Sequence, residues 1–248
     1  KENVAAGLLL AAVEQLDALA AATGKSIRIC LEMEPGGVLE RTDQTVAFFD
    51  WLHNAARAAG ISPERVQRHL GACYDACHQA VMYEDPGVAL GRLIDAGIAI
   101  GKMQLSCALE AQPGAHAALG DYAEPRYLHQ VRIPDVQTLL GAPDIGPALS
   151  DPTLPVDRPW RVHFHVPLHA DPPTASGLRS TRAELTQVFG VLAKRPMLTP
   201  HLEVETYTWS VLPASQRPTD NEALIAGIAA ELHWVETEMQ RHGLLAGD

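Results

Sequence analysis

Basic residues are scarce in this chain of 248 residues: 19 lysines and arginines stand against 30 aspartates and glutamates, a formal net charge of −11. A surface of this sign repels phosphates, so nucleic acid is not expected as a general partner. Cysteine is also scarce. The four cysteines (Cys30, Cys73, Cys77 and Cys107) are too few for a disulfide scaffold, and they favour a reducing, cytoplasmic location.

Long apolar runs and the common nucleotide-binding and serine-hydrolase motifs are missing as well. The apolar opening, residues 4–22, is interrupted by Glu14, Gln15 and Asp17. It falls short of the roughly 18 continuous apolar residues of a membrane span. We therefore expect an amphipathic helix, no signal peptide and no membrane partner. The sequence contains no GxGxxG, P-loop or GxSxG motif, so nothing favours a dinucleotide enzyme, an ATPase or a serine hydrolase.

Apolar periodicity and turn residues predict strands that alternate with helices. Short apolar runs predict buried strands at residues 26–33, 69–74, 98–105, 161–167 and 201–207. Helical patterns with capping residues cover residues 3–22, 42–59, 63–68, 86–96, 181–193 and 221–242. This alternation is typical of βαβ units and a parallel sheet. An open doubly wound sheet and a (β/α)8 barrel both agree with it.

The length supports the barrel, which typically needs about 250 residues, but only five strands are predicted. The chain also opens on a helix and on Lys1 instead of methionine. A barrel therefore implies an N-terminally truncated single domain, residues 1–248, with five parallel strands. Residues 108–159 hold many of the prolines and no regular pattern. We expect this segment to be a lid-like insertion over the site.

Polar residues gather at or near the carboxyl ends of all five predicted strands. They are Glu32 and Glu34; Asp75 and His78; Gln104; His163 and His165; and Glu203 and Glu205. In parallel α/β folds this edge carries the active site. Residues two apart on a strand face the same side of the sheet. The two members of the pairs Glu32 and Glu34, His163 and His165, and Glu203 and Glu205 can therefore point into the same cavity.

Carboxylates and imidazoles in one cavity suit a divalent metal such as Zn, Mn, Fe or Co. Each residue also has a structural alternative. Asp75 could cap the following turn, Glu34 could face solvent, and one of the two histidines on the fourth strand could be structural. Gln104 is a weak ligand that could bind substrate or hold a neighbouring ligand. The C-x3-C pair Cys73 and Cys77 could bind metal or form a disulfide.

Several segments resemble a known superfamily. LGACYDACH (70–78) is similar to the strand-loop signature of xylose isomerase-like, endonuclease IV-like TIM barrels, in which an Asp-x-x-His pair ligates metal. CLEMEPG (30–36), KMQLSCAL (102–109), RYLHQ (126–130), WRVHFHVPL (160–168) and HLEVETYTW (201–209) resemble blocks of the EboE family of metabolite-traffic proteins. The resemblance implies a (β/α)8 TIM barrel of the xylose isomerase-like type. Gln104 stands where the superfamily often has histidine, and His163-Phe164-His165 where endonuclease IV-like members have Asp-x-His.

These observations lead to a metal-dependent isomerase or epimerase acting on a small sugar-like, polyol or prenyl-derived metabolite. We expect the metal ligands to be Glu32, Asp75, Gln104 and Glu205. The predicted proton-transfer groups, or ligands of a second metal cluster, are His78, His163 and His165. Predicted substrate contacts are Glu34, Arg126, His129 and Glu203. A non-catalytic metabolite carrier and a phosphodiesterase or nuclease are the alternatives, although the acidic composition disfavours the last.

Overall fold

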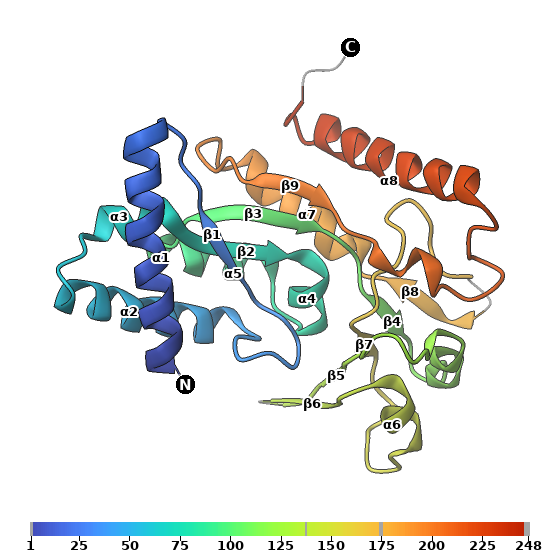
Figure 1. Cartoon of the computed structure of the whole chain (residues 1–248). Helices are drawn as coiled ribbons and strands as arrows, with labels where there is room; N and C mark the ends of the chain where they lie inside the picture. The colour runs from blue at the N-terminus through green and yellow to red at the C-terminus, as the bar shows by residue number, and fades with distance from the viewer. Residues whose placement is uncertain (1, 137, 174–175, 246–248) are drawn as a thin grey trace.

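The computed structural model describes residues 2–136, 138–173 and 176–245. Within these residues the strands form two sheets that lie beside each other (Figure 1). One has four strands in the order β1-β2-β3-β9, and the other has five in the order β6-β5-β7-β4-β8. The protein is therefore a mixed α/β protein, as predicted.

The four-stranded sheet is parallel throughout. It consists of β1 (Ile29–Glu32), β2 (Leu70–Asp75), β3 (Ile100–Leu105) and β9 (His201–Val204). The register pairs Asp75 with Gln104 and Gln104 with Glu203 across the sheet. The carboxyl ends of these strands therefore lie at one edge, where the polar residues were predicted to meet.

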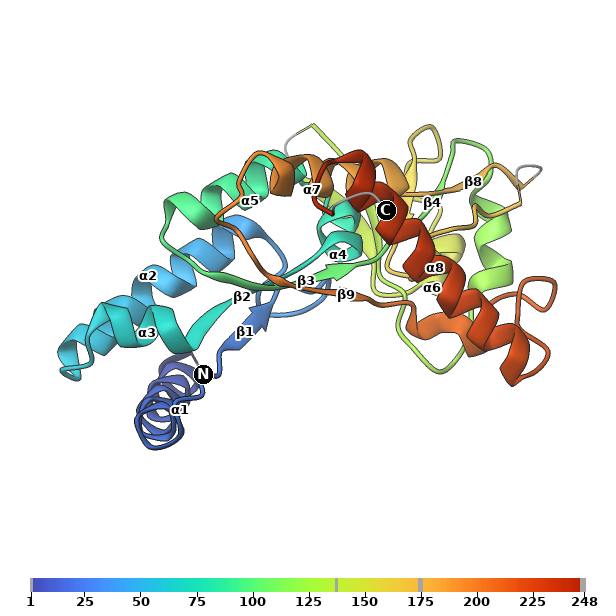
Figure 2. The ribbon, with the colours of Figure 1, turned by 90° about the horizontal axis from the view of Figure 1, so that it is seen from above.

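Helices cover one face of this sheet (Figure 2). They are α2 (Thr42–Ala58), α3 (Pro63–His69), α4 (Ala76–Val81), α5 (Pro86–Asp95) and α7 (Arg182–Ala193). Residues in the first turn favour the start of α3 and α5: Pro63 and Pro86 occupy first-turn positions, and the Asp85 side chain accepts the N–H of Val88. Proline suits that position because the first-turn N–H has no partner inside the helix. Buried leucines and Phe189 on these helices pack in the core.

The other face of the parallel sheet carries no helix over its centre in the part of the chain described (Figure 2). Helix α1 (Glu2–Thr23) lies at the β1 edge and contacts α3 and α2. Helix α8 (Asn221–Arg241) contacts α7, with Trp234 against Phe189. Residues 4–23 of α1 are long and apolar enough to cross a membrane by length and composition, a test that soluble core helices and signal sequences also pass.

The five-stranded sheet is antiparallel and was not predicted. It contains β4 (Leu109–Ala111), β5 (Val131–Pro134), β6 (Leu139–Ala142), β7 (Trp160–Val162) and β8 (Leu178–Ser180). The segment 108–159, expected to lack regular structure, supplies β4, β5, β6, the 3-10 helix η1 (His116–Tyr122) and α6 (Ile145–Ser150). Leu109, Val131 and Ile133 are fully buried, so this segment is part of the core.

The prediction of five parallel strands was wrong. The run at residues 161–167 forms only β7, which pairs antiparallel with β4 and β5, while β3 pairs directly with β9. Directly after β7 the N–H of Phe164 donates to the carbonyl of Val162 at 2.7 Å. This tight turn ends the ladder, and His163 and His165 therefore lie outside both sheets.

Candidate metal centre

Asp75 ends β2 and begins α4. Its Oδ1 accepts the backbone N–H of His78 at 2.9 Å and the hydroxyl of Ser106 at 2.8 Å. The predicted capping role is therefore present, but it uses only one oxygen. The other oxygen, Oδ2, is buried and has no hydrogen-bond partner among the described residues. A buried carboxylate oxygen without a donor is costly unless something positive binds it.

Three histidine rings converge beside this free oxygen. The Nδ1 atom of His78 lies 2.9 Å from the carbonyl of Met33, and that of His165 lies 2.6 Å from the carbonyl of Glu205. Because a carbonyl can only accept, both rings carry hydrogen on Nδ1. His163 places its Nδ1 2.7 Å from Oε1 of Gln130. The Nε2 atoms of His163 and His165 are buried without a partner in the described structure.

The spacing of these groups suits a shared ion. One ligand atom each from His78, His163 and His165 lie within 4.8 Å of one another, and so do atoms of Glu32, Asp75 and His78. A further such group joins Asp75, Cys77 and His165. Imidazole nitrogens whose other ring nitrogen is held by an oxygen are the usual metal ligands in proteins. The donor set fits a borderline divalent cation such as zinc.

The other predicted ligands lie at the rim of this cluster. Gln104 donates from Nε2 to Oε1 of Glu32 at 2.6 Å, so it holds that carboxylate in place. Glu32 in turn lies 3.4 Å from Nδ1 of His78. Oε2 of Glu205 lies 3.7 Å from Nδ1 of His165. The cluster therefore brings together all four predicted ligands and all three predicted catalytic histidines.

The charges of the cluster are not independent. Burial raises the pKa of Glu205 to about 8; the charge of Asp75, the hydrogen bond that a protonated Glu205 carboxyl donates to Asp75, and the charge of Glu32 add to the effect. Burial also raises the pKa of Glu32, although His78 opposes it. For Asp75, burial alone would raise the pKa, but His78, His165 and the hydrogen bonds it accepts lower it overall. Asp75 is thus the carboxylate that stays ionised, while Glu205 retains a proton near neutrality.

Two of the rings are neutral at ordinary pH. Burial lowers the pKa of His163 well below its usual range, and the other histidines add to this. Burial lowers the pKa of His165 to about 4, although Asp75 acts in the opposite direction. Metal binding requires unprotonated imidazole nitrogen, so these rings need no proton release at neutral pH.

A cavity of about 510 Å³ opens onto the cluster. Its lining includes five residues of the cluster and, from the substrate prediction, Glu34 and Arg126. The remaining wall comes from Tyr127, Leu128, Gln130 and Tyr207. The guanidinium of Arg126 is held by Ser210 at 3.1 Å. The segment predicted as a lid therefore contributes one wall of the cavity.

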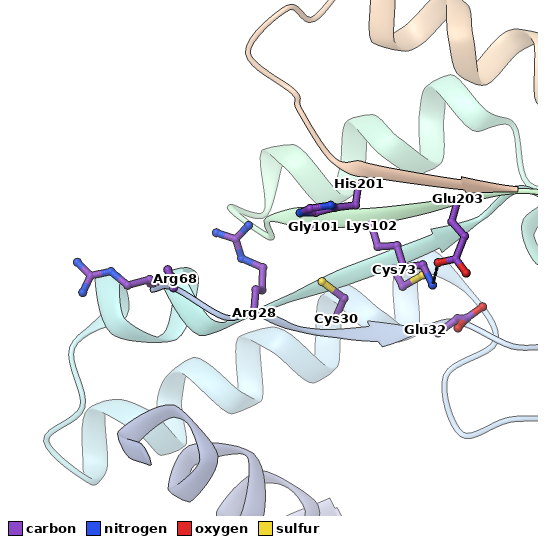
Figure 3. A pocket seen from close by; sticks show the side chains of 10 residues that line it. Arg28, Cys30, Glu32, Arg68, Cys73, Gly101, Lys102, His201 and Glu203 are labelled. Carbon is purple, nitrogen blue, oxygen red and sulfur yellow. Dashed lines mark ion pairs between the residues drawn. The ribbon is translucent and has the colours of Figure 1, made fainter. Parts of the chain in front are cut away.

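Two predicted substrate contacts lie elsewhere. His129 is fully buried behind the cluster, where its Nδ1 contacts the carbonyl of His163 at 2.9 Å and its Nε2 contacts Glu124 at 3.1 Å. Glu203 is exposed on the uncovered sheet face and pairs with Lys102 at 2.5 Å (Figure 3). Because Glu205 lies beyond the end of β9, the expectation that Glu203 and Glu205 share a cavity was wrong.

The uncovered face contains a second cavity, of about 670 Å³ (Figure 3). Arg28, Cys30, Cys73 and Lys102 line it together with His201 and Glu203. Glu32 lines both cavities and connects them. Two cations of the second cavity are in ion pairs, Lys102 with Glu203 and Arg68 with Asp17 at 3.2 Å, while Arg28 donates to the carbonyl of Gln67 at 3.2 Å. The four cysteines are free thiols, so the possible Cys73–Cys77 disulfide is not formed.

Two residues of the site were missed from the sequence: Ser106 follows β3 and donates to Asp75, and Gln130 contacts His163. Cys77, for which metal binding was an open alternative, lies next to Asp75 and His165. Ser106 stands two residues after Gln104, so the strand-end rule could have found it. Gln130 belongs to the segment RYLHQ (126–130), but nothing in the sequence connects it to a histidine 33 residues away.

Comparison of the chain with protein-family models, curated proteins and solved structures found no match.

Proposed function

We propose that this chain is a metal-dependent isomerase or epimerase acting on a small sugar-like or polyol metabolite. The observation that supports it best is the convergence of three imidazoles and an ionised, buried carboxylate. Nε2 of His163, Nε2 of His165 and Oδ2 of Asp75 have no partner among the described residues. Without a cation, so many unmatched acceptors in one buried place would be strongly unfavourable.

His78, His163, His165 and Asp75 are the residues that would hold the ion, with Glu32 and Glu205 at the rim. A bound divalent metal supplies Lewis acidity toward the oxygens of a substrate that carries adjacent hydroxyl or carbonyl groups. This differs from the sequence prediction: the histidines are assigned as ligands of the same ion as Asp75, and Gln104 is no longer assigned as a ligand.

Proton transfer then falls to a carboxylate. Glu205 lines the cavity, and its raised pKa of about 8 lets it both accept and donate a proton near neutral pH. Glu34 and Arg126 line the same cavity and would orient the polar groups of the metabolite. Gln104 holds Glu32 and keeps this wall in place.

For the fold, we propose part of a xylose isomerase-like TIM barrel, related to the EboE metabolite-traffic family and working in the cytoplasm. Both β1 and β9 have a free edge within the described sheet, and polar side chains cover its uncovered face. In a TIM barrel each strand pairs with a neighbour on both sides and the site lies at the carboxyl ends of the strands, so the two free edges and the position of the cluster agree with part of a barrel. The five-stranded antiparallel sheet is then an insertion into the barrel that forms one wall of the cavity.

Elemental analysis of the purified chain, followed by zinc titration calorimetry, tests the metal site. We expect transition metal in the isolated protein and its loss in a His163→Ala, His165→Ala double variant. Turnover of a panel of simple ketoses by the metal-loaded protein tests the isomerase activity. Metal binding with no turnover of any ketose would favour the metabolite carrier, and absence of metal binding would exclude the proposed centre.

A further inference from the structure

The side chain of Gln130 connects the antiparallel sheet to the metal centre. Gln130 directly precedes β5 and lines the cavity. Its Oε1 lies 2.7 Å from Nδ1 of His163, and its backbone carbonyl accepts the N–H of His163 at 2.9 Å. One residue therefore holds both the ring and the backbone of a buried histidine that lies in neither sheet.

The direction of this amide decides what His163 can do. A neutral imidazole carries its proton on only one of its two nitrogens. When Oε1 of Gln130 accepts, the proton sits on Nδ1 and the lone pair on Nε2 is directed into the cluster. A reversed amide would donate to Nδ1 and move the proton to Nε2. His163 could then no longer bind a metal with that atom.

The turn at Gly36 packs against the same amide. Gly36 has φ +84°, and a Cβ there would lie 3.2 Å from Nε2 and 3.4 Å from Cγ of Gln130. A side chain at Gly36 would thus press on the amide, in addition to the strain of a left-handed backbone. The absence of a side chain at this position leaves the glutamine room to reach His163.

An amide also suits the charge of the site. Glu32, Asp75 and Glu205 already share the centre. A carboxylate at position 130 would hold Nδ1–H equally well but would add a fourth acidic group. The amide fixes the ring and leaves the charge of the centre unchanged.

We propose that Gln130 is a positioning residue that selects the Nδ1–H tautomer of His163 and thereby makes Nε2 of that ring a metal ligand. The ligand part of this inference rests on the proposed metal function. The tautomer part does not, because it concerns the metal-free protein.

Long-range ¹H–¹⁵N spectra of the metal-free full chain with ¹⁵N-labelled histidine test the tautomer, and His163→Gln identifies the signal. We expect Nδ1–H in the wild type and in Gln130→Glu. Loss of this preference is expected in Gln130→Met and in the shorter-amide variant Gln130→Asn. Gln67→Met, at an exposed glutamine of α3, is the matched control. An unchanged Nδ1–H signal in folded Gln130→Met and Gln130→Asn would overturn the proposal.

Zinc titrations of the same variants test the consequence. Loss of a group that orients a ligand typically weakens metal binding by about 10- to 100-fold. We expect that loss in Gln130→Met, recovery in Gln130→Glu and no change in Gln67→Met. A changed tautomer with unchanged zinc affinity would overturn the ligand role of His163. If the wild type binds no zinc but the tautomer still follows residue 130, the tautomer assignment is supported and the metal centre is not.

Discussion

The backbone N–H of His78 donates to Oδ1 of Asp75 at 2.9 Å, while Oδ2 of the same carboxylate lies 3.8 Å from Nε2 of the His78 ring. One oxygen thus fixes the first turn of α4, and that turn carries the histidine back toward the other oxygen. The Asp-x-x-His spacing produces the capped turn locally, and the carbonyl of Met33 and the hydroxyl of Ser106 then hold the His78 ring and the Asp75 carboxylate in place.

Because Oδ1 of Asp75 caps the helix and Oδ2 faces the cluster, Asp75→Asn should weaken metal binding without lowering the stability of the protein. Asparagine caps a helix as well as aspartate does, so the thermal midpoint of the metal-free protein should not fall. The lost negative charge should weaken zinc binding by at least about tenfold. Calorimetry and a thermal melt measure the two effects.

Asp75→Ala is the control for the cap. It removes both oxygens and should also destabilise the protein by about 1 kcal/mol, the usual loss for a helix cap. Equal zinc affinity in the wild type and in Asp75→Asn would show that the carboxylate is only structural.

A second prediction contrasts two glutamates that stand two residues apart. Glu203 pairs with Lys102 on the exposed face, whereas Glu205 lines the cavity of the candidate metal centre. Glu203→Gln should leave zinc affinity within about twofold, since exposed ion pairs contribute little. Glu205→Gln should lower it. The same titration measures both variants, and an equal loss in the two would contradict the placement of Glu203 outside the site.

The third prediction concerns Arg126. Its guanidinium lies at the cavity wall, held by Ser210, and contacts none of the cluster carboxylates as an ion pair within the described structure. Arg126→Gln should therefore leave the metal content unchanged and raise the KM for a turned-over ketose about fivefold, a loss of roughly 1 kcal/mol. A drop in kcat with an unchanged KM would show that Arg126 acts in the chemical step instead of in binding.

The parallel part of the fold was predictable because its signals are local. Continuous apolar runs and proline or aspartate starts located β1, β2, β3, β9, α2, α3, α5 and α7 to within a few residues, whereas the short helix α4 was not predicted. The antiparallel sheet was not predictable in this way. Three of its five strands (β4, β7 and β8) have three residues, and their pairing depends on partners up to 71 residues away, as for Leu109 and Ser180.

The proximity of His163 and His165 was predicted, but not the local structure that produces it. His163 and His165 were expected together because residues two apart share a strand face. Their rings do lie 5.5 Å apart, but the turn after β7 and hydrogen bonds to Gln130 and Glu205 bring this about. His129 shows the limit of reasoning from residue type. Its polar ring reads as a substrate contact, yet both nitrogens are used inside the core.

The final prediction is a pH dependence centred on Glu205. Its pKa in the folded protein is about 8, raised from the ordinary 4.5 first by burial and then by the Asp75 charge. A folded-state pKa above the unfolded one stabilises the protein fully below the unfolded pKa, and this contribution is lost as pH rises through the folded pKa. The metal-free protein should therefore lose thermal stability between about pH 5 and pH 9, and Glu205→Gln should flatten that part of the profile.

The zinc affinity should rise with pH, whereas the stability of the metal-free protein should fall. A cation favours the ionised form of Glu205, so binding below pH 8 displaces a proton and the apparent zinc affinity should rise as the solution becomes more alkaline. Calorimetry in two buffers of different ionisation enthalpy measures the released proton directly. Glu205→Gln should abolish most of this release, whereas Glu203→Gln should not alter it. A zinc affinity that is independent of pH between about 6 and 9 would mean that Glu205 does not face the ion.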